Sequence, residues 1–156
     1  MSRRDLYTSL LYARQNPFIG KLAYFLLKTL GAEVPRPVKL GQECLLVHGG
    51  FGVVIHPKSV LGNRVKIYPG VTLGRADIYR PMEESRFQGI EIGDDVILCP
   101  GAKILCREGI LLVGRGTVVG ANAVLLQSTG ENELWVGVPA RCVGHRPNIE
   151  GNESFA

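Results

Sequence analysis

The sequence has no run of lysine or arginine, no closely spaced pair of cysteines and no long uninterrupted apolar stretch. Because nucleic-acid-binding chains carry a basic stripe, a net charge of +4 without such a stripe gives no indication of a nucleic-acid partner. The four scattered cysteines form no Cys-x-x-Cys motif, so they indicate neither a zinc site nor a disulfide framework. Unpaired cysteines are typical of a reducing compartment, and we therefore expect a cytoplasmic protein. The length of 156 residues predicts one domain.

The first segment, residues 1–31, predicts two short helices ahead of the main pattern. Asn16 and Pro17 have the form of a helix cap followed by a first-turn proline. The second helix is strongly apolar but too short to span a bilayer, and Lys21 and Lys28 interrupt it. We expect the helices to cover the open end of the following repeat, where strand edges would otherwise be unpaired. Contact with a membrane surface is the less favoured alternative.

The rest of the chain repeats every six residues. Aliphatic anchors occupy Leu40, Leu46, Ile55, Leu61, Ile67, Leu73, Ile92, Leu98, Ile104, Val113, Val119 and Leu125, and Val34 and Val136 extend the series. The residue four places after an anchor is usually small or β-branched, and glycine often follows the anchor. This period fits neither a helix nor an alternating strand. It is typical of a β-solenoid with triangular coils, in which each side is one hexapeptide and the anchors point inward.

Breaks in the period divide the repeat. Leu46 and Ile55 lie nine residues apart instead of six, as do Ile104 and Val113, and Leu73 is followed by Ile92 only after nineteen. Insertions in repeat proteins form loops that leave the stack. We therefore predict a repeat domain over 32–144 with a polar loop over 74–89. Residues 145–156 are predicted to be a flexible tail.

Four short runs resemble those of the left-handed β-helix acyltransferases with hexapeptide repeats. The runs are Val71-Thr-Leu-Gly74, Gly101-Ala-Lys-Ile-Leu105, Val113-Gly-Arg-Gly116 and Gly137-Val-Pro-Ala-Arg141. They look like runs of the serine acetyltransferases, and similar ones occur in capsule and exopolysaccharide O-acetyltransferases. The resemblance implies an all-β fold, a left-handed parallel β-helix with a short N-terminal helical cap. It also implies a homotrimer of parallel prisms with acetyl-CoA in the groove between neighbours.

Transfer of an acetyl group to a hydroxyl requires a base for the hydroxyl proton, and histidine titrates in the right range. His48 is the candidate base, and we expect the adjacent Gly49 and Gly50 to let a substrate approach the backbone closely. Serine acetyltransferases place an aspartate partner fifteen residues before their histidine, where this chain has Glu33. His48 could instead be a structural corner histidine, and Glu33 a solvated linker charge.

The chain departs from the serine enzymes in two respects. Their second catalytic histidine lies in Arg-His-Pro-Lys-Ile, where this chain has Phe87 after Arg86. Their long helical domain is replaced by about thirty residues ahead of the repeat. Both departures favour a saccharide or sugar-nucleotide acceptor, with serine O-acetylation as the alternative and a non-catalytic scaffold as a third reading. A γ-class carbonic anhydrase needs three histidines around zinc, which His48, His56 and His145 do not provide, so we expect no metal.

The resemblance also assigns contacts for the cofactor and the acceptor. Acetyl-CoA would contact the upper coils at Ala102, Lys103, Arg115, Gly120, Ala121, Pro139 and Arg141. The acceptor would contact Gly49, Gly50, Arg75, Tyr79, Arg80 and Arg86. Arginine binds phosphate and carboxylate through charge-assisted hydrogen bonds, which would suit an anionic or nucleotide-linked sugar. Each of these charges could also be ordinary solvated surface charge.

Overall fold

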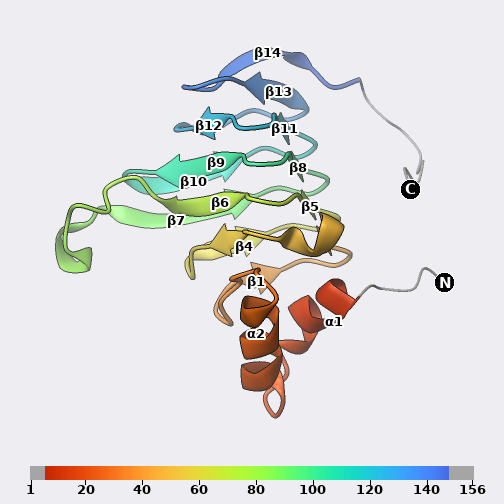
Figure 1. Cartoon of the computed structure of the whole chain (residues 1–156). Coiled ribbons are helices and arrows are strands. Elements are labelled where there is room, and N and C mark those ends of the chain that lie inside the picture. Colours follow the sequence, from red (N-terminus) through yellow and green to blue (C-terminus); the bar gives the residue numbers. More distant parts are fainter. Residues whose placement is uncertain (1–5, 148–156) are drawn as a thin grey trace.

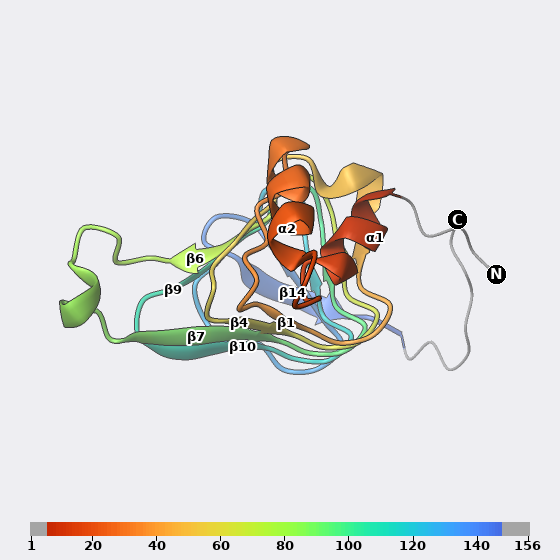
Figure 2. The ribbon, with the colours of Figure 1, turned by 90° about the horizontal axis from the view of Figure 1, so that it is seen from below.

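The computed structural model describes residues 6–147, which form two helices followed by a stack of short parallel strands. Each coil of the chain adds one strand to each of three sheets (Figure 1). Seen from below, the coils superpose in a three-sided outline (Figure 2). The parallel, mostly β architecture predicted from the six-residue period is therefore confirmed.

The three sheets run along the stack. The first sheet has the order β1 (Lys39–Leu40), β4 (Ser59–Leu61), β7 (Phe87–Ile92), β10 (Gly109–Val113). The second has the order β2 (Leu45–Leu46), β5 (Lys66–Ile67), β8 (Ile97–Leu98), β11 (Val118–Val119), β13 (Glu133–Val136), β14 (Arg141–His145). The third has the order β3 (Val54–Ile55), β6 (Thr72–Arg75), β9 (Lys103–Cys106), β12 (Val124–Leu125). All pairs are parallel except β13 with β14.

The core is a column of stacked anchors. All twelve main anchors are buried except Leu40, which is half-buried. The small residues four places on are buried too: Val38, Cys44, Ser59, Val65, Val71, Val96, Ala102, Thr117, Ala123 and Ala140. Val136 breaks the series, because Trp135 pairs with Val119 and takes the inward position. Successive strand residues face opposite sides, so this one-residue offset leaves Val136 exposed.

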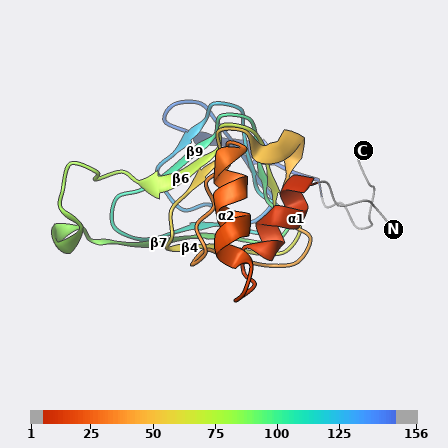
Figure 3. The ribbon, with the colours of Figure 1, turned by 60° about the horizontal axis from the view of Figure 1, so that its bottom comes forward.

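Two helices lie across the lower end of the stack, α1 (Leu6–Ala13) and α2 (Gly20–Thr29) (Figure 3). The Asn16 side-chain oxygen accepts hydrogen bonds from the backbone N–H groups of Phe18 and Ile19 at 2.8 and 3.2 Å, as a cap does. Leu11 and Leu27 belong to the same buried cluster as the first anchors. The helices therefore complete the core of the lowest coil.

Arg14 joins these helices to the first coil. Its guanidinium is fully buried and donates to the carbonyl oxygens of Pro35 (2.7 Å), Arg36 (3.1 Å) and Val38 (2.9 Å). Burial lowers the pKa of Arg14 to about 10, which leaves the side chain charged at neutral pH. Carbonyl groups of the first coil have no coil beneath them, so the arginine supplies donors where the stack ends.

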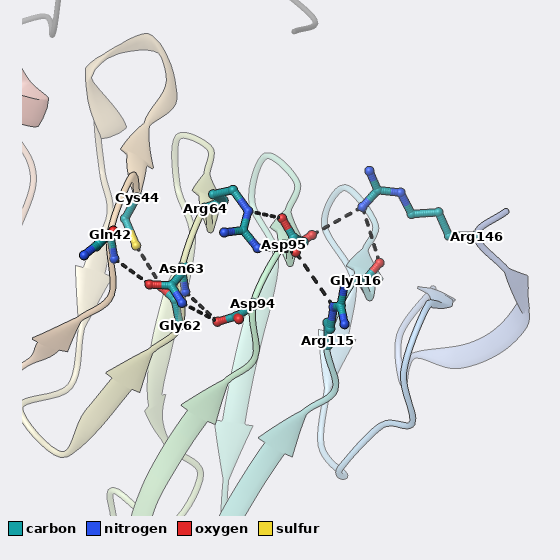
Figure 4. Close-up of polar contacts among 10 residues, drawn as sticks. All are labelled: Gln42, Cys44, Gly62, Asn63, Arg64, Asp94, Asp95, Arg115, Gly116 and Arg146. Carbon is teal, nitrogen blue, oxygen red and sulfur yellow. Dashed lines mark hydrogen bonds and ion pairs between the residues drawn. The ribbon is translucent and has the colours of Figure 1, made fainter. Parts of the chain in front are cut away.

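A polar ladder follows the corner between the first and second sheets (Figure 4). Arg64 forms a bidentate pair with Asp95 at 2.6 and 2.7 Å, which lowers the pKa of that carboxyl. Asp94 accepts from Asn63 in the coil below at 2.7 Å, and Arg146 donates to the Asp95 carbonyl oxygen at 3.3 Å. Successive coils are therefore joined by side chains as well as by backbone hydrogen bonds.

The observed boundaries differ from the predicted ones at two places. Gly74, Arg75 and Phe87 belong to strands, so the excursion predicted over 74–89 is shorter and contains η2 (Met82–Glu84). At the other end, β14 continues to His145, and the backbone N–H of Arg146 donates to Asn132. The predicted tail therefore begins with ordered chain, and its residues 148–156 lie outside the described residues.

Candidate active site

His48 lies where the first nine-residue spacing interrupts the repeat. It follows β2 in a short 3-10 segment, η1 (Val47–Gly50), with a left-handed backbone of φ 51° and ψ 34°. This conformation is uncommon for a residue with a side chain, although corner residues such as Arg64 and Asn122 share it here. His48 is exposed, and its ring centroid lies 6.2 Å from that of Tyr68. An accessible imidazole of this kind can accept a proton from an incoming hydroxyl.

The two glycines after His48 have a packing role rather than the open approach expected. Both are buried, with φ of 77° and 62°. A Cβ on Gly49 would lie 2.8 Å from the Tyr7 ring, and one on Gly50 would lie 2.8 Å from the Leu46 side chain. Helix α1 therefore packs directly against the backbone that carries His48. The substrate contact of Gly49 and Gly50 stays a prediction.

Glu33 has partners other than the expected one. Its carboxylate accepts hydrogen bonds from Lys28 Nζ at 2.9 Å and from the Tyr24 hydroxyl at 3.4 Å. Its backbone pairs with Val54 at the foot of the third sheet. Within residues 6–147, Glu33 and His48 are not joined by a hydrogen bond or ion pair. The side chain stabilises the junction of α2 with the first coil.

The corner above His48, between the second and third sheets, is built from stacked glycine turns. The backbone N–H of Gly70 donates to Phe51 O at 2.8 Å, and that of Gly101 donates to Pro69 O at 2.8 Å. The N–H of Asn122 continues the column to Pro100 O at 2.9 Å. His48 therefore stands at the foot of a continuous edge that runs up the stack.

Most of the residues expected to hold the cofactor lie along this edge. Lys103 donates its ammonium group to the carbonyl oxygen of Gly70, two coils above the helices. Gly120 and Ala121 form the next turn, and Val124 N–H bonds to Gly137 O in the turn above. Pro139 is exposed, and Arg141 begins β14 and donates to Ala140 O. Ala102 is fully buried in the single chain.

Arg115 lies at a different corner. It belongs to the polar ladder of Figure 4, where its Nε is 3.9 Å from Asp95 Oδ2 and its side chain is 67% exposed. In a single chain it is therefore separated from the edge that carries His48 and Lys103. The structure groups Arg115 with Arg64 and Arg146 instead.

The expected acceptor residues lie at the third corner, between the third and first sheets, where the chain projects from the stack (Figure 2). A hollow of about 340 Å³ there is lined by Asp77, Arg80, Arg86, Arg107 and Glu108. Arg75 lies beside it, with Nε 3.5 Å from Asp77 Oδ1 and Nη2 3.0 Å from Arg80 O. The exposed Tyr79 ring lies under the Arg80 guanidinium, 5.7 Å away. Arg75, Tyr79, Arg80 and Arg86 thus lie at this corner, whereas Gly49 and Gly50 follow His48 at another, and the acceptor contact of all six stays a prediction.

Asp77 gives the hollow a specific polar group. It is 3% exposed, and its Oδ2 accepts a hydrogen bond from the Ser85 hydroxyl at 2.8 Å. Its Oδ1 has no hydrogen-bond donor within the described part of the chain, although Arg75 is near. A buried carboxylate oxygen without a donor is costly, and a ligand hydroxyl or ammonium would satisfy it. The arginines nearby would bind an anionic group of the same ligand.

His56 lies at this third corner too. Its ring is edge-on to Phe87, with centroids 4.6 Å apart, and its Nδ1 accepts a hydrogen bond from Lys58 N–H at 3.1 Å. Burial, followed by the charges of Lys58 and Arg75, lowers the pKa of His56. Phe87, which stands where the serine enzymes have their second histidine, is itself buried. The His56 imidazole therefore lies directly against Phe87.

Sequence reasoning missed Asp77, Arg107 and Glu108. These residues could have been predicted from the positions at which the six-residue period is interrupted. The breaks before Ile92 and before Val113 fall at the same corner of successive coils, so the two inserted segments meet in space. The polar residues of both insertions are then candidates for one site.

Two general properties of residues 6–147 complete this description. In this range, His, Cys, Asp and Glu side chains form no group of three that could hold a metal ion. Neither α1 nor α2 has the length and apolar content needed to cross a membrane, and the same range has no other α-helix.

Comparison with known proteins relates the chain to one group of enzymes by sequence. No family model matches it. It is 34% identical over 134 residues to a serine acetyltransferase of Bacillus licheniformis, a match covering 85% of this chain and 58% of that protein. It is 35% identical over 113 residues to a serine acetyltransferase of Staphylococcus aureus strain Mu50, covering 72% and 49%. The chain thus spans about half the length of the relatives it matches.

Solved structures give the same result. The serine acetyltransferase of Brucella abortus strain S19 superposes with a TM-score of 0.73 at 26% identity, covering 90% of this chain and 56% of that one. The structure of that enzyme in complex with coenzyme A superposes with a TM-score of 0.69 at 27% identity, and the match covers 89% of this chain and 53% of that one. The Neisseria gonorrhoeae enzyme in complex with serine gives 0.64 at 30% identity, covering 86% and 51%. By sequence and by fold, this chain is similar to the repeat-bearing half of serine acetyltransferases.

Proposed function

We propose that this chain is an acetyl-CoA-dependent O-acetyltransferase with His48 as general base. Its stack would be the left-handed β-helix of serine acetyltransferases, closed at the lower end by α1 and α2. The observation that carries the proposal is the exposed His48 at the foot of the edge where Lys103, Gly120 and Arg141 also lie. The similarity to serine acetyltransferases supports acetyl-CoA as the donor.

The reaction would use the imidazole twice. As the acceptor hydroxyl oxygen attacks the thioester carbonyl carbon, His48 takes the hydroxyl proton. When the tetrahedral intermediate collapses, the carbon–sulfur bond breaks and the imidazolium returns that proton to the leaving thiolate. Backbone N–H groups at the turns of the edge are the available donors for the oxyanion. The positive side chains of Lys103 and Arg141 would hold the cofactor phosphates.

A homotrimer of parallel prisms would complete the site. In one chain the acceptor hollow and His48 occupy different corners of the stack. Packing of three prisms would bring the projecting loop of one protomer to the His48 edge of the next, with acetyl-CoA between them. Arg115, which belongs to the remaining corner, could then reach the cofactor of a neighbouring protomer.

Two acceptors are supported by different observations. The names of the relatives support L-serine, which is the better supported of the two. A saccharide or sugar nucleotide is supported by the buried Phe87 at the place of the second histidine and by the hollow. At about 340 Å³ and with three arginines in its lining, the hollow fits a ligand with an anionic group.

Replacement of His48 by asparagine tests the catalytic assignment. Asparagine tolerates a left-handed backbone, so His48→Asn removes the base with little strain. We expect acetyl-CoA-dependent thiol release with a working acceptor to fall by at least about 100-fold. His145→Asn, a matched change on β14, should leave the rate unchanged. Full turnover by His48→Asn would show that His48 is not the base.

The same thiol assay decides the acceptor. L-serine, simple sugars and nucleoside-diphosphate sugars are supplied in parallel to the wild-type chain. Thiol release with serine alone would support the serine enzyme, and release with sugars alone would support the saccharide enzyme. Charge reversal in the hollow, Arg107→Glu, should raise the KM for an anionic acceptor at least about tenfold and leave the KM for acetyl-CoA unchanged.

A further inference from the structure

Helix α2 has its broad apolar face directed away from the stack. Its buried residues Gly20, Ala23 and Leu27 form a narrow stripe toward the first coil. On the other side, large apolar residues recur at spacings of three and four and are exposed: Phe18, Ile19, Leu22, Phe25, Leu26 and Leu30. Phe18 is 92% exposed and Phe25 64%. A helix that only capped the core would show a polar outer face.

The N-terminal part of the sequence, which includes α2, carries an excess of positive charge. Residues 1–39 contain seven Lys or Arg and two Asp or Glu, a net charge of +5. Residues 40–156 contain eleven Lys or Arg and twelve Asp or Glu, a net charge of −1. Lys21 and Lys28 lie on α2 itself and both are exposed, and the Lys28 ammonium forms an ion pair with Glu33 at 2.9 Å. Of the described residues, 6–39 hold five Lys or Arg and one Glu, a net charge of +4, with Arg14 fully buried, and 40–147 hold eleven Lys or Arg and ten Asp or Glu, a net charge of +1. Most of the net positive charge of the described residues therefore belongs to the helices and the start of the first coil.

The position of α2 makes this face accessible to a flat surface. Both helices lie at the lower extremity of the molecule, beyond the first coil (Figure 1 and Figure 3). In a homotrimer of parallel prisms, three copies would face the same plane, and simultaneous contacts raise the effective affinity.

From these observations we infer that the α2 face binds the surface of an anionic phospholipid bilayer. Phenylalanine and leucine side chains enter the boundary between headgroups and acyl chains, and Lys21 contacts the phosphate headgroups. A protein partner would not require a positive charge concentrated at this end, whereas an anionic membrane is attracted by it. The helix lies in the interface and does not cross the bilayer.

Membrane binding would bring the candidate catalytic base close to the lipid. Tyr7 of α1 packs on Gly49, so His48 lies at the helical end of the stack. If the proposed acetyltransferase activity holds, a hydroxyl acceptor attached to a lipid would reach this end first. The binding itself does not depend on that activity.

Vesicle sedimentation with the full chain tests the inference. Vesicles of phosphatidylcholine and phosphatidylglycerol in equal parts are compared with vesicles of phosphatidylcholine alone. We expect the wild-type chain to sediment with the anionic vesicles. Binding should fall when NaCl is raised from about 0.1 M to about 1 M, because the Debye length shortens from about 10 Å to about 3 Å. The double substitution Phe18→Ser and Phe25→Ser should weaken binding at least about tenfold.

A matched control changes two exposed apolar residues at the upper end, Leu126→Ser and Val143→Ser. This variant should bind vesicles as the wild type does, and both variants should keep the wild-type circular dichroism. Absence of vesicle binding by the wild type, or equal loss in both variants, would overturn the inference. It would also be overturned if the phenylalanine substitutions lowered the particle mass in light scattering while vesicles were not bound, because the face would then join copies of this chain.

Discussion

Single residues fix the places where the repeat begins and where it is interrupted. Arg14 is the clearest case, because its fully buried guanidinium uses both Nη groups as donors, while its Nε has no hydrogen-bond partner among the described residues. Three carbonyl groups of the first coil accept from it, and Arg36 Nε donates back to the Arg14 carbonyl at 3.1 Å. The charged side chain of Arg14 thus supplies hydrogen-bond donors that a further coil below the first one would otherwise supply.

We predict that Arg14→Met lowers the free energy of unfolding by about 3 kcal/mol or more, because three carbonyl groups, of which that of Val38 accepts a buried hydrogen bond, lose a charged donor. Urea denaturation followed by circular dichroism measures the change. Lys21→Met, on the exposed side of α2, should change the free energy of unfolding by less than about 0.5 kcal/mol. A loss below about 1 kcal/mol for Arg14→Met would mean that water replaces the guanidinium.

At the scale of elements, η1 shows how the stack positions a side chain for chemistry. Three extra residues between β2 and β3 leave the prism, and the left-handed residues at 48–50 turn the chain back. Helix α1 holds this segment from outside, through the Tyr7 ring on Gly49. The orientation of His48 therefore depends on a helix that precedes the repeat.

Gly49→Ala tests this dependence. The added methyl group meets both a left-handed backbone and the Tyr7 ring, so we expect a loss of about 1–3 kcal/mol in unfolding free energy. The rate of thiol release should also fall. Gly109→Ala is the matched control, since Gly109 has a φ of 66° but no atom within 4 Å of the added carbon. Equal losses of stability in the two variants would show that the Tyr7 contact contributes nothing.

At the scale of the whole molecule, the three corners of the prism have different contents. One corner carries His48 and the glycine turns, one carries the charged ladder, and one carries the projecting loop and its hollow. Because the stack is rigid, the corner with His48 and the corner with the hollow of the same chain cannot come together. The proposed site therefore requires more than one copy of the chain.

We predict a particle with three times the 17.0 kDa chain mass in light scattering. Mixed assembly supplies a sharper test. When a His48→Asn chain is co-expressed with an Arg107→Glu chain, some interfaces should combine an intact base with an intact hollow. Thiol release with an anionic acceptor should then exceed that of either variant alone. A monomeric particle that is fully active, or no recovery in mixed particles, would contradict the trimeric site.

The sequence by itself determined the coils, because an inward anchor at every sixth position is a local property that any coil must satisfy. The buried anchors and the ten buried small residues were predictable on that ground, and so was the cap at Asn16. Trp135 was not, since the antiparallel β14 that closes the stack leaves no mark on the six-residue period.

Only the tertiary structure decided which side chains meet. Glu33 pairs with Lys28 rather than His48, and Asp77 and Arg107, from two different insertions, line the same hollow. These contacts depend on the register of one coil on the next and on the course of the inserted segments. A repeat fixes the interior of each coil but not where its insertions lie. The exposed face of α2 was also decided only by the tertiary structure. The sequence predicts an apolar helix to be part of the core, and only the packing shows which of its sides is covered.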